Sequence, residues 1–474
     1  MQVRAAGSLY DALVVGSGPN GLAAAVTLAE AGRSVLVLEA DDEAGGGLRT
    51  MELTEPGFRH DVCSTIQAMA NLSPFLQHRP LDLVRPPAAL AHPLDTGAVA
   101  VVEGSVADTA RGLGQDGAAY RRLLGPLEPH AEQLFADLLG PPRPPRRPLL
   151  ASRFGLPALL PAQTLARVAF RDAPARALFA GVAAHGMISL REPASSAFAL
   201  VLFLAAHGGG WPLARGGSAS VAAALIARLQ ELGGEVKCGE RVDSVDRLPR
   251  AGAVLLDLTP REVLRVAGGR LSGGYRRGLR RYRYGPGAFK LDWALDGPIP
   301  WRAPECRRAA TVHLGGTLEE VALAESEVAA GRVPERPFVL LVQPTLFDPS
   351  RAPAGKHVGW AYCHVPNGCD VDMTQRIEDQ VERFAPGFRD LVRARSAWGP
   401  SDIESHNANY VGGDINGGRQ DLGQLFTRPM PRLNPYSTSD PQIFLCSSAT
   451  PPGGGVHGMC GWHAAQTALR RALA

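Results

Sequence analysis

Two short apolar runs near the start of the chain, residues 11–15 (DALVV) and 34–38 (SVLVL), have the length and composition of buried strands. The segment between them is rich in alanine and stops at Gly32, a residue type that often follows the last turn of a helix. The pattern therefore predicts a strand, a helix and a second strand over residues 11–39, the unit from which parallel sheets are built.

The turn after the first strand carries the clearest chemical signal. It reads Gly16-Ser17-Gly18-Pro19-Asn20-Gly21, a G-x-G-x-x-G sequence. In such a turn the first glycine permits the tight bend, the second lets a pyrophosphate approach the backbone, and the third lets the helix pack on the strand. The helix N-terminus would direct free N–H groups at the phosphates.

The second strand ends at an acid, Glu39, followed by Ala40. A carboxylate at this offset is placed to accept hydrogen bonds from a ribose diol, which favours FAD or NAD over NADP. The strands, the helix, the glycine turn and the acid together predict a dinucleotide site, in which we include Pro19 and Asn20 with the three glycines.

A glycine-rich loop, residues 45–65, follows Glu39 and should lie near the carboxyl edge of the sheet, where ligands bind in such folds. Gly46, Gly47, Leu48 and Arg49 open this loop. Arg49 is its main cation, and it could face either a phosphate or flavin group or an acid in a surface ion pair.

Helix and strand patterns return later in the chain. Residues 159–206 favour helices, 216–234 a helix, 235–245 an alternating strand and 251–260 a buried strand. Residues 284–301 alternate like a strand, and the last forty residues contain a strand at 442–446, a glycine loop and a helix over 462–473. Residues 141–148 (PPRPPRRP) predict a stiff connection between two helical pieces.

This order predicts an α/β fold in which a substrate domain interrupts a nucleotide-binding domain. We place the nucleotide-binding domain at residues 1–75, 210–285 and 435–474, and an α+β substrate or cap domain at residues 76–209 and 286–434.

Composition excludes several other classes. The 474 residues carry a net charge of only +3, without a basic run that suggests nucleic-acid binding. Seven scattered cysteines without a C-x-x-C indicate reduced thiols and no metal site. We expect no secretory signal at the N-terminus and a cytoplasmic protein, with peripheral membrane contact and oligomeric state left open. The longest apolar run, residues 197–206, is too short to span a bilayer and predicts a buried helix, with a membrane-dipping helix or the wall of a lipophilic channel as alternatives.

Near the C-terminus, residues 446–465 read CSSATPPGGGVHGMCGWHAA. With this loop at one end and the glycine turn at the other, nearly the whole chain resembles the phytoene desaturase-related FAD oxidoreductases. That group belongs to a wider flavoprotein class with the amine oxidases and the Rab GDP-dissociation inhibitors. Further resemblance lies in GGGLRT (residues 45–50), PGFRHDVCS (56–64), GGWPLARGGS (209–218), YGPGAFKLDWALDGPIPW (284–301) and YVGGDINGG (410–418).

The resemblance implies a Rossmann-like FAD-binding domain of the glutathione-reductase type and a role for each matching residue. Gly16, Gly18 and Gly21 would hold the pyrophosphate, Glu39 the adenosine ribose, and the backbone of Val242 the adenine. The stretch from Gly46 to Arg49 would lie along the pyrophosphate and flavin. The residues beside the isoalloxazine ring would be Gly455, Val456 and Met459. The dipole of the closing helix would stabilise negative charge on reduced flavin.

The chain shows no second dinucleotide fingerprint and no redox C-x-x-C, so a disulfide reductase is not expected. We predict hydride transfer from an organic, lipophilic small molecule to flavin N5, with the electrons leaving to oxygen, a quinone or another carrier. His457, in the glycine loop, could move a proton or only hydrogen-bond the backbone. Lys290 could sit near flavin N5, bind an acidic substrate group or place its amine at the surface.

Weaker candidates for proton handling are His60, His463 and Cys460, which we expect to be local structural residues. Cys446-Ser447-Ser448 stands where amine oxidases usually carry an acid, which favours the desaturase-like branch. A redox-neutral flavin isomerase, an amine oxidase and a binding protein that has lost the chemistry are kept as alternatives.

Overall fold

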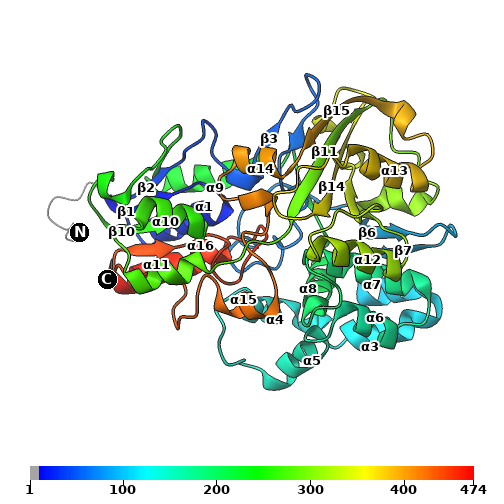
Figure 1. The fold of residues 1–474 in the computed structure, drawn as a ribbon, viewed down its shortest axis with the longest axis horizontal. Helices are drawn as coiled ribbons and strands as arrows, with labels where there is room; N and C mark the ends of the chain where they lie inside the picture. Colours follow the sequence, from blue (N-terminus) through cyan, green and yellow to red (C-terminus); the bar gives the residue numbers. More distant parts are fainter. Residues whose placement is uncertain (1–9) are drawn as a thin grey trace.

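The computed structural model describes residues 10–474, so the expectation about a secretory signal, which depends on residues 1–9, lies outside the described residues. Two sheets form the framework (Figure 1). The first is a five-stranded parallel sheet in the order β16-β10-β1-β2-β9. Its strands are β1 (Tyr10–Val15), β2 (Val35–Leu38), β9 (Glu235–Lys237), β10 (Ala251–Leu256) and β16 (Ile443–Leu445).

The predicted strand–helix–strand unit is confirmed. Helix α1 (Pro19–Glu30) starts with a proline, which needs no hydrogen-bond partner for its nitrogen there, and ends just before Gly32, whose φ of 76° suits a residue without a side chain. A Cβ atom on Gly21 would lie 2.1 Å from the carbonyl oxygen of Gly16. The third glycine of the turn is therefore required by the packing of α1 on β1, as the pattern predicted.

Helices from distant parts of the chain cover this sheet. Helix α16 (Met459–Arg471) packs on α1 so closely that a Cβ atom on Gly461 would lie 1.8 Å from the carbonyl oxygen of Asn20. Helix α9 (Ala219–Glu231) also packs on α1. Helices α10 (Pro260–Ala267) and α11 (Gly273–Arg280) follow β10. The predicted α/β fold class is confirmed.

The second sheet is mixed, with seven strands in the order β15-β11-β14-β13-β12-β6-β7. Its neighbours are antiparallel except for the parallel pair β12 and β6. The strands are β6 (Ala88–Pro93), β7 (Val99–Val102), β11 (Gly287–Leu295), β12 (Ala309–Leu314), β13 (Val339–Val342), β14 (His357–Val365) and β15 (Val392–Trp398). Two-stranded pairs are β3 (Thr50–Met51) with β4 (His60–Asp61), and β5 (Leu83–Val84) with β8 (Leu213–Ala214).

A helical block lies beside the second sheet, at the lower right of Figure 1. It comprises α2 (Val106–Gly112), α3 (Gly117–Leu124), α4 (Ala131–Leu138), α5 (Pro148–Ala158), α6 (Ala162–Ala169), α7 (Ala173–Ala184) and α8 (Ser195–His207). The proline-rich segment joins α4 to α5, as predicted. The remaining helices are α12 (Leu318–Ala329), α13 (Thr374–Phe384), α14 (Pro400–His406) and α15 (Leu422–Thr427).

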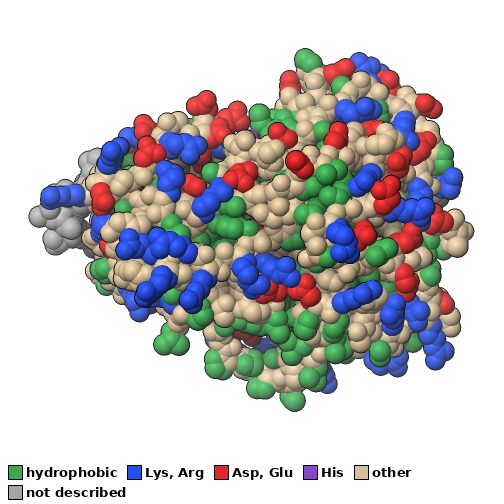
Figure 2. Space-filling view, in the orientation of Figure 1, with side chains coloured by type: hydrophobic (Ala, Val, Ile, Leu, Met, Phe, Trp, Pro, Cys, Tyr) green, Lys and Arg blue, Asp and Glu red, His purple; other side chains and the backbone are tan. Residues whose placement is uncertain are grey.

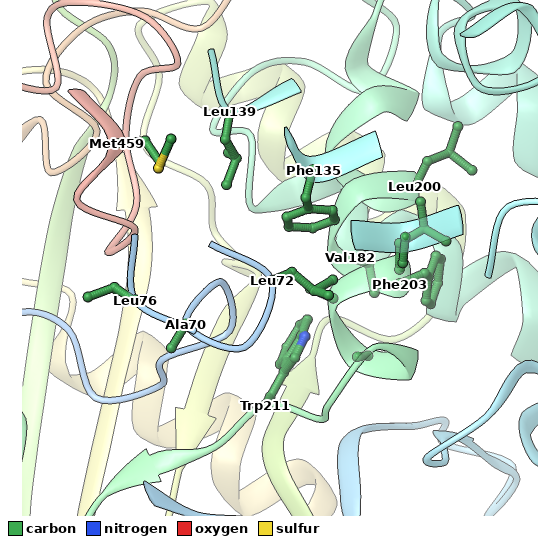
Figure 3. Packing of buried hydrophobic residues seen from close by; sticks show 14 of the residues in the cluster. Ala70, Leu72, Leu76, Phe135, Leu139, Val182, Leu200, Phe203, Trp211 and Met459 are labelled. Carbon is green, nitrogen blue, oxygen red and sulfur yellow. The ribbon is translucent and has the colours of Figure 1, made fainter. Parts of the chain in front are cut away.

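The largest hydrophobic core runs through both parts of the molecule (Figure 3). Leu72 and Leu76, from the segment before the helical block, lie near Met459 of α16 on one side and Phe135 of α4 on the other. Trp211, fully buried, closes the core where the chain leaves α8. A shared core of this kind holds the nucleotide-binding part and the helical block in fixed positions.

Two sequence-based predictions were wrong in extent. Only Glu235–Lys237 of the predicted strand 235–245 pairs with β2, because the chain then turns at Gly239, whose φ is 72°. The closing helix starts at Met459 and not at residue 462, because Gly458 takes a left-handed conformation that starts the helix earlier. The domain boundaries remain a prediction, and the pair of β5 with β8 joins a segment assigned to the substrate domain with one assigned to the nucleotide-binding domain.

Candidate active site

One cavity of about 950 Å³ links the parallel sheet to the helical block. At its first end the walls are the turn after β1, the tip of β2 and residues 257–259 after β10. Its middle is bounded by Gly46, Gly47 and Arg49 and by residues 405–410 and 454–457. At its second end the side chains are mostly apolar and come from α4, α5, α8 and the second sheet.

Glu39 organises the first end of the cavity. Its Oε2 atom accepts hydrogen bonds from the backbone N–H of Ser17 at 2.9 Å and from the Ser17 hydroxyl at 2.5 Å. Its Oε1 atom accepts a bond from the N–H of Asp41 and lies 3.5 Å from the Arg49 guanidinium. The carboxylate therefore fixes the glycine turn and still lines the cavity, where a ribose hydroxyl could reach it.

Arg49 is buried and holds its own loop. Its guanidinium pairs with Asp41 at 2.7 Å and donates to the carbonyl of Glu43 at 3.0 Å. His406 lies 3.4 Å from the same guanidinium. Arg49 is therefore ion-paired with acids, but its guanidinium is buried and does not form the surface ion pair that the sequence suggested. The guanidinium also lines the cavity, and its contact with a phosphate or flavin group remains a prediction.

Asp257 is an acid that the sequence analysis did not include among the predicted site residues. Its Oδ2 atom accepts a hydrogen bond from the backbone N–H of Gly21 at 2.9 Å, so it caps α1 from a neighbouring strand. A Cβ atom on Gly18 would lie 2.8 Å from the same oxygen. Burial raises the pKa of Asp257 to about 7, the Gly21 N–H lowers it in part, and the charge of Glu39 raises it further.

The glycine loop before α16 is shaped by its own histidine. The Nδ1 atom of His457 accepts a hydrogen bond from the N–H of Met459 at 3.0 Å, and Nε2 donates to the carbonyl of Gly453 at 3.2 Å. Burial lowers the pKa of His457 to about 4, so the ring is neutral at pH 7. Both ring nitrogens are therefore engaged inside the loop, although the ring borders the cavity.

Lys290 is buried, at 3% exposure, so the alternative that placed its amine at the surface was wrong. The amine pairs with Asp292, which also lies 3.5 Å from His60. Burial raises the pKa of Asp292 to about 6, while the Lys290 amine acts in the opposite direction. Lys290 borders a small side cavity whose wall shares Cys63, Trp360, Tyr362, His406, Tyr410 and Ile415 with the main cavity.

The structure brings most of the predicted site residues to one cavity. Its lining contains Gly16, Gly18, Pro19, Asn20, Glu39, Ala40, Gly46, Gly47, Arg49, Val242, Gly455, Val456 and His457. The side chains of Leu48 and Met459 lie in the hydrophobic core instead, and Gly21 serves the packing of α1. Among the weaker candidates, His60 contacts Thr54, while His463 and Cys460 bond to backbone carbonyls.

One signal in the sequence could have found more of the site. Asp257 follows the buried strand β10 as Glu39 follows β2, and parallel strands bring their carboxyl ends to one edge. Tyr410 belongs to a segment noted only for its resemblance, yet a Cβ atom on Gly47 would meet its hydroxyl at 2.3 Å. No pattern in the sequence indicated that Gly47 and Tyr410, 363 residues apart, face each other.

Comparisons with known proteins agree with this arrangement. The NAD(P)-binding Rossmann-like domain family matches residues 14–78. Pyridine nucleotide-disulfide oxidoreductase domain-containing protein 2 of Rattus norvegicus is 25% identical, over 97% of this chain and 93% of the rat protein. Phytoene dehydrogenase of Streptomyces griseus is 27% identical, over 82% of this chain and 78% of the bacterial protein.

Solved structures share the fold. An oxidoreductase from Methanosarcina mazei superimposes with a TM-score of 0.66 at 15% identity, covering 97% of this chain and 100% of that one. A putrescine oxidase variant superimposes with a TM-score of 0.60 at 18% identity, covering 98% of this chain and 99% of that one. At these identities the likeness concerns the fold alone.

Fold, cavity and relatives define the class: the protein is an oxidoreductase built on a dinucleotide-binding α/β fold. Within that class the chain is similar to phytoene dehydrogenase and phytoene desaturase, which confirms the resemblance noted in the sequence. The predicted cofactor, FAD, agrees with this class. Within residues 10–474, no helix combines the length and hydropathy needed to cross a bilayer.

Proposed function

We propose that this protein is an FAD-dependent dehydrogenase or desaturase that oxidises a lipophilic organic substrate. The observation that carries the proposal is the single cavity that joins the glycine turn after β1 to the apolar wall of the helical block. A dinucleotide would fill the first end. The second end would take the substrate, because leucine, phenylalanine and alanine side chains of α5 and α8 form its wall.

The residues at the first end fit FAD. Gly16 has a φ of 98°, and Gly46 approaches the turn so closely that a Cβ atom there would lie 2.9 Å from the Cα atom of Gly18. Asn20 lines the same turn, and its buried Oδ1 atom has no hydrogen-bond partner in the described part of the chain. Residues 16–20 would hold the diphosphate, and Glu39 the ribose.

FAD, when bound, supplies a two-electron acceptor for a hydride from the substrate, and the electrons then pass to oxygen, a quinone or another carrier. The chain positions the substrate and excludes water. Phe198 and Val201 of α8, with Leu150 and Phe154 of α5, close the second end around it. We assign His457 to shaping its loop, because both of its ring nitrogens are already hydrogen-bonded.

For the proton that leaves with the hydride, we assign Lys290 together with Asp292: the Lys290 ammonium passes its own proton to the Asp292 carboxylate, and the neutral amine then accepts the proton from the substrate. The side cavity next to its amine has a volume of about 20 Å³, enough for one water molecule, and adjoins the main cavity at Tyr362 and Tyr410. Lys290→Met should keep bound FAD and slow anaerobic flavin reduction by a substrate at least about 100-fold. An unchanged rate would remove Lys290 from the mechanism.

The first test of the whole proposal is the absorption spectrum of the purified protein, followed by heat release and identification of the cofactor. Flavin bands with released FAD are expected, and bleaching by a lipophilic substrate under anaerobic conditions would show the direction of electron flow. A colourless protein that also fails to bind added FAD would contradict the proposal and favour a binding protein. Reduced-flavin dependence without consumption of an acceptor would favour the isomerase.

We also propose that the mouth of the cavity contacts a membrane surface. Leu149, Leu156, Leu159 and Leu160 are exposed on and after α5, which lines the cavity with its other face. Figure 2 shows apolar side chains gathered along this lower edge of the molecule. The neighbouring arginines Arg143, Arg146, Arg147 and Arg153 are exposed and would pair with anionic lipid headgroups.

A further inference from the structure

The second sheet carries polar side chains into the apolar end of the cavity. Strand register aligns Lys290 with Tyr362, Tyr362 with Leu340, and Leu340 with His313, so these four residues form one row across β11, β14, β13 and β12. Residues paired in this way point to the same face of a sheet. Tyr362 and Leu340 line the cavity, so the row leads from the Lys290 side toward the helical block.

At the end of this row stand three histidines that the proposed hydride chemistry does not use. His185, just after α7, lines the cavity, and its Nε2 atom lies 3.0 Å from the Nε2 atom of His313. His92 of β6 lies behind, with its ring centroid 6.0 Å from that of His313. Gly181 of α7 makes room for them, since a Cβ atom there would lie 2.7 Å from the Nδ1 atoms of both His92 and His313.

Burial keeps these rings uncharged. It lowers the pKa of His185 to about 3 and that of His92 to about 4, and it lowers the pKa of His313 as well. Within residues 10–474, no group of three or more histidine, cysteine or acidic side chains is arranged to hold a metal ion. The nearby wall is formed by Trp211, Thr311, Leu340 and Tyr362, none of which carries a charge at pH 7.

Hydrogen bonds fix the tautomer of one of these neutral rings. His92 lies 2.8 Å from the carbonyl of Gly316 through Nε2, which must therefore carry the proton and leave Nδ1 as an acceptor. The Nδ1 atoms of His92 and His313 are both buried without a hydrogen-bond partner among the described residues, so His92 does not set the tautomer of His313. Of the two Nε2 atoms that face each other in His185 and His313, one donates and the other accepts, and Nδ1 of His185 takes the opposite role to its own Nε2.

Nδ1 of His185 makes no hydrogen bond with any of the residues 10–474, and it is not among the fully enclosed polar atoms. A ring nitrogen on the wall of an apolar cavity selects a ligand with a matching polar group, and a hydroxyl group matches either tautomer of the ring because it both donates and accepts. We propose that Nδ1 of His185 forms a hydrogen bond with a hydroxyl group of the substrate, with His313 and His92 as positioning residues. This inference rests on the proposed function, and it narrows the substrate class from lipophilic compounds in general to lipophilic alcohols.

The test compares three ligands of one chain length, dodecan-1-ol, dodecane and dodecanoate, on the purified FAD-loaded protein. Binding is followed by displacement of the apolar dye N-phenyl-1-naphthylamine. The wild-type protein is expected to prefer the alcohol to the alkane by about three- to tenfold beyond their difference in solubility, the scale of one net hydrogen bond. Equal binding of alcohol and alkane, or preference for the carboxylate, would overturn the inference.

Variants show which residue causes the preference for the alcohol. His185→Phe keeps an aromatic ring and should abolish this preference. Phe198→Leu, an apolar change in the same cavity wall, should change the binding of the alcohol and of the alkane by the same factor. His313→Leu should reduce the preference for the alcohol, because it removes the hydrogen bond that holds the ring of His185 in place. A preference that survives in His185→Phe but disappears in Tyr362→Phe would assign the hydroxyl to Tyr362 and contradict the proposal for His185.

FAD content separates this inference from the proposed function. Flavin absorbance that is retained in every variant, with no preference for the alcohol, would reject the hydroxyl subsite and leave the oxidoreductase proposal standing. A wild-type protein without flavin would instead contradict the proposed function. If His185→Phe does not fold, the ligand comparison on the wild-type protein still decides the matter.

Discussion

At the scale of single residues, protonation of Asp257, next to the glycine turn, makes the stability of the fold depend on pH. Its carboxyl group is buried next to Gly18 and Gly21, and its pKa is about 7 in the folded protein against 3.8 in the unfolded chain. A raised acid pKa means that the folded state binds the proton more tightly. The stabilising effect is therefore complete below pH 4 and is lost as pH rises through 7.

Asp257→Asn should remove this pH dependence, because the amide keeps an oxygen to accept the Gly21 N–H and cannot ionise. The difference between a pKa of 3.8 and one of about 7 corresponds to about 4 kcal/mol, so the variant should be more stable than the wild type by up to that amount at pH 8 and equal to it at pH 4. Urea unfolding at several pH values measures the difference. Asp42→Asn, an exposed acid on the next loop, is the control. A constant difference at all pH values would contradict the assignment.

Glu39 is the second residue whose contribution can be measured by itself, in this case its contribution to FAD binding. Glu39→Gln should weaken FAD binding by about 1.5–3 kcal/mol, the usual scale for a hydrogen bond to a charged group. Arg49 keeps Asp41 as an ion-pair partner in this variant, so the loop should persist. Quenching of FAD fluorescence on titration with apoprotein gives the affinity, with Glu43→Gln on the same loop as the control. An unchanged affinity would remove Glu39 from the site.

At the scale of elements, α5 has two apolar faces with different tasks. Leu150 and Phe154 line the cavity, whereas Leu149 and Leu156 are 82% and 71% exposed. An exposed apolar face next to a cavity mouth is costly in water and favourable against lipid. The helix is therefore the element on which membrane contact can be tested without changing the cavity.

The double variant Leu149→Ser with Leu156→Ser should lower binding to vesicles of mixed phosphatidylcholine and phosphatidylglycerol by about tenfold or more, since each leucine side chain contributes about 1.5–3 kcal/mol when buried. Stability should change by less than about 0.5 kcal/mol per site, as is usual for surface positions. Co-sedimentation measures binding, and Leu323→Ser on α12, where the leucine is also exposed, is the control. Equal loss in both variants would reject α5 as the contact.

At the scale of the whole molecule, the site is assembled from segments that are far apart in sequence. The turn after β1, the acid after β10 and the loop before α16 meet only because the parallel sheet places their strands side by side. A ligand that contacts all of them binds only the folded protein, and its binding free energy adds to the free energy of unfolding.

Removal of FAD should therefore destabilise the protein. At free FAD one hundred times the dissociation constant, the holoprotein should be more stable than the apoprotein by about 2.7 kcal/mol, and the difference should grow with FAD concentration. Thermal unfolding of the apoprotein across a range of FAD concentrations tests this, with FMN, which lacks the adenosine part, as the control ligand. A melting temperature that does not depend on FAD would contradict the site.

The sequence by itself determined the features that depend on neighbouring residues. The strands at 10–15 and 35–38, the helix between them and the position of Glu39 follow from short-range apolar patterns and from backbone requirements at Gly16 and Gly21. The resemblance at the two ends of the chain extended these local signals to the class of protein and its cofactor. The ends of helices and strands were predicted less accurately, because turns such as the one at Gly239 depend on where the segment lies in the tertiary structure.

Only the tertiary structure decided which side chains share a space. It buried Lys290 against Asp292, engaged both nitrogens of His457 within its loop, and placed Asp257 under the glycine turn. It also set His185 of the helical block against His313 of the second sheet, 128 residues away. Such contacts join positions with no periodic relation in the sequence, since they arise from the packing of sheets and helices around a common core.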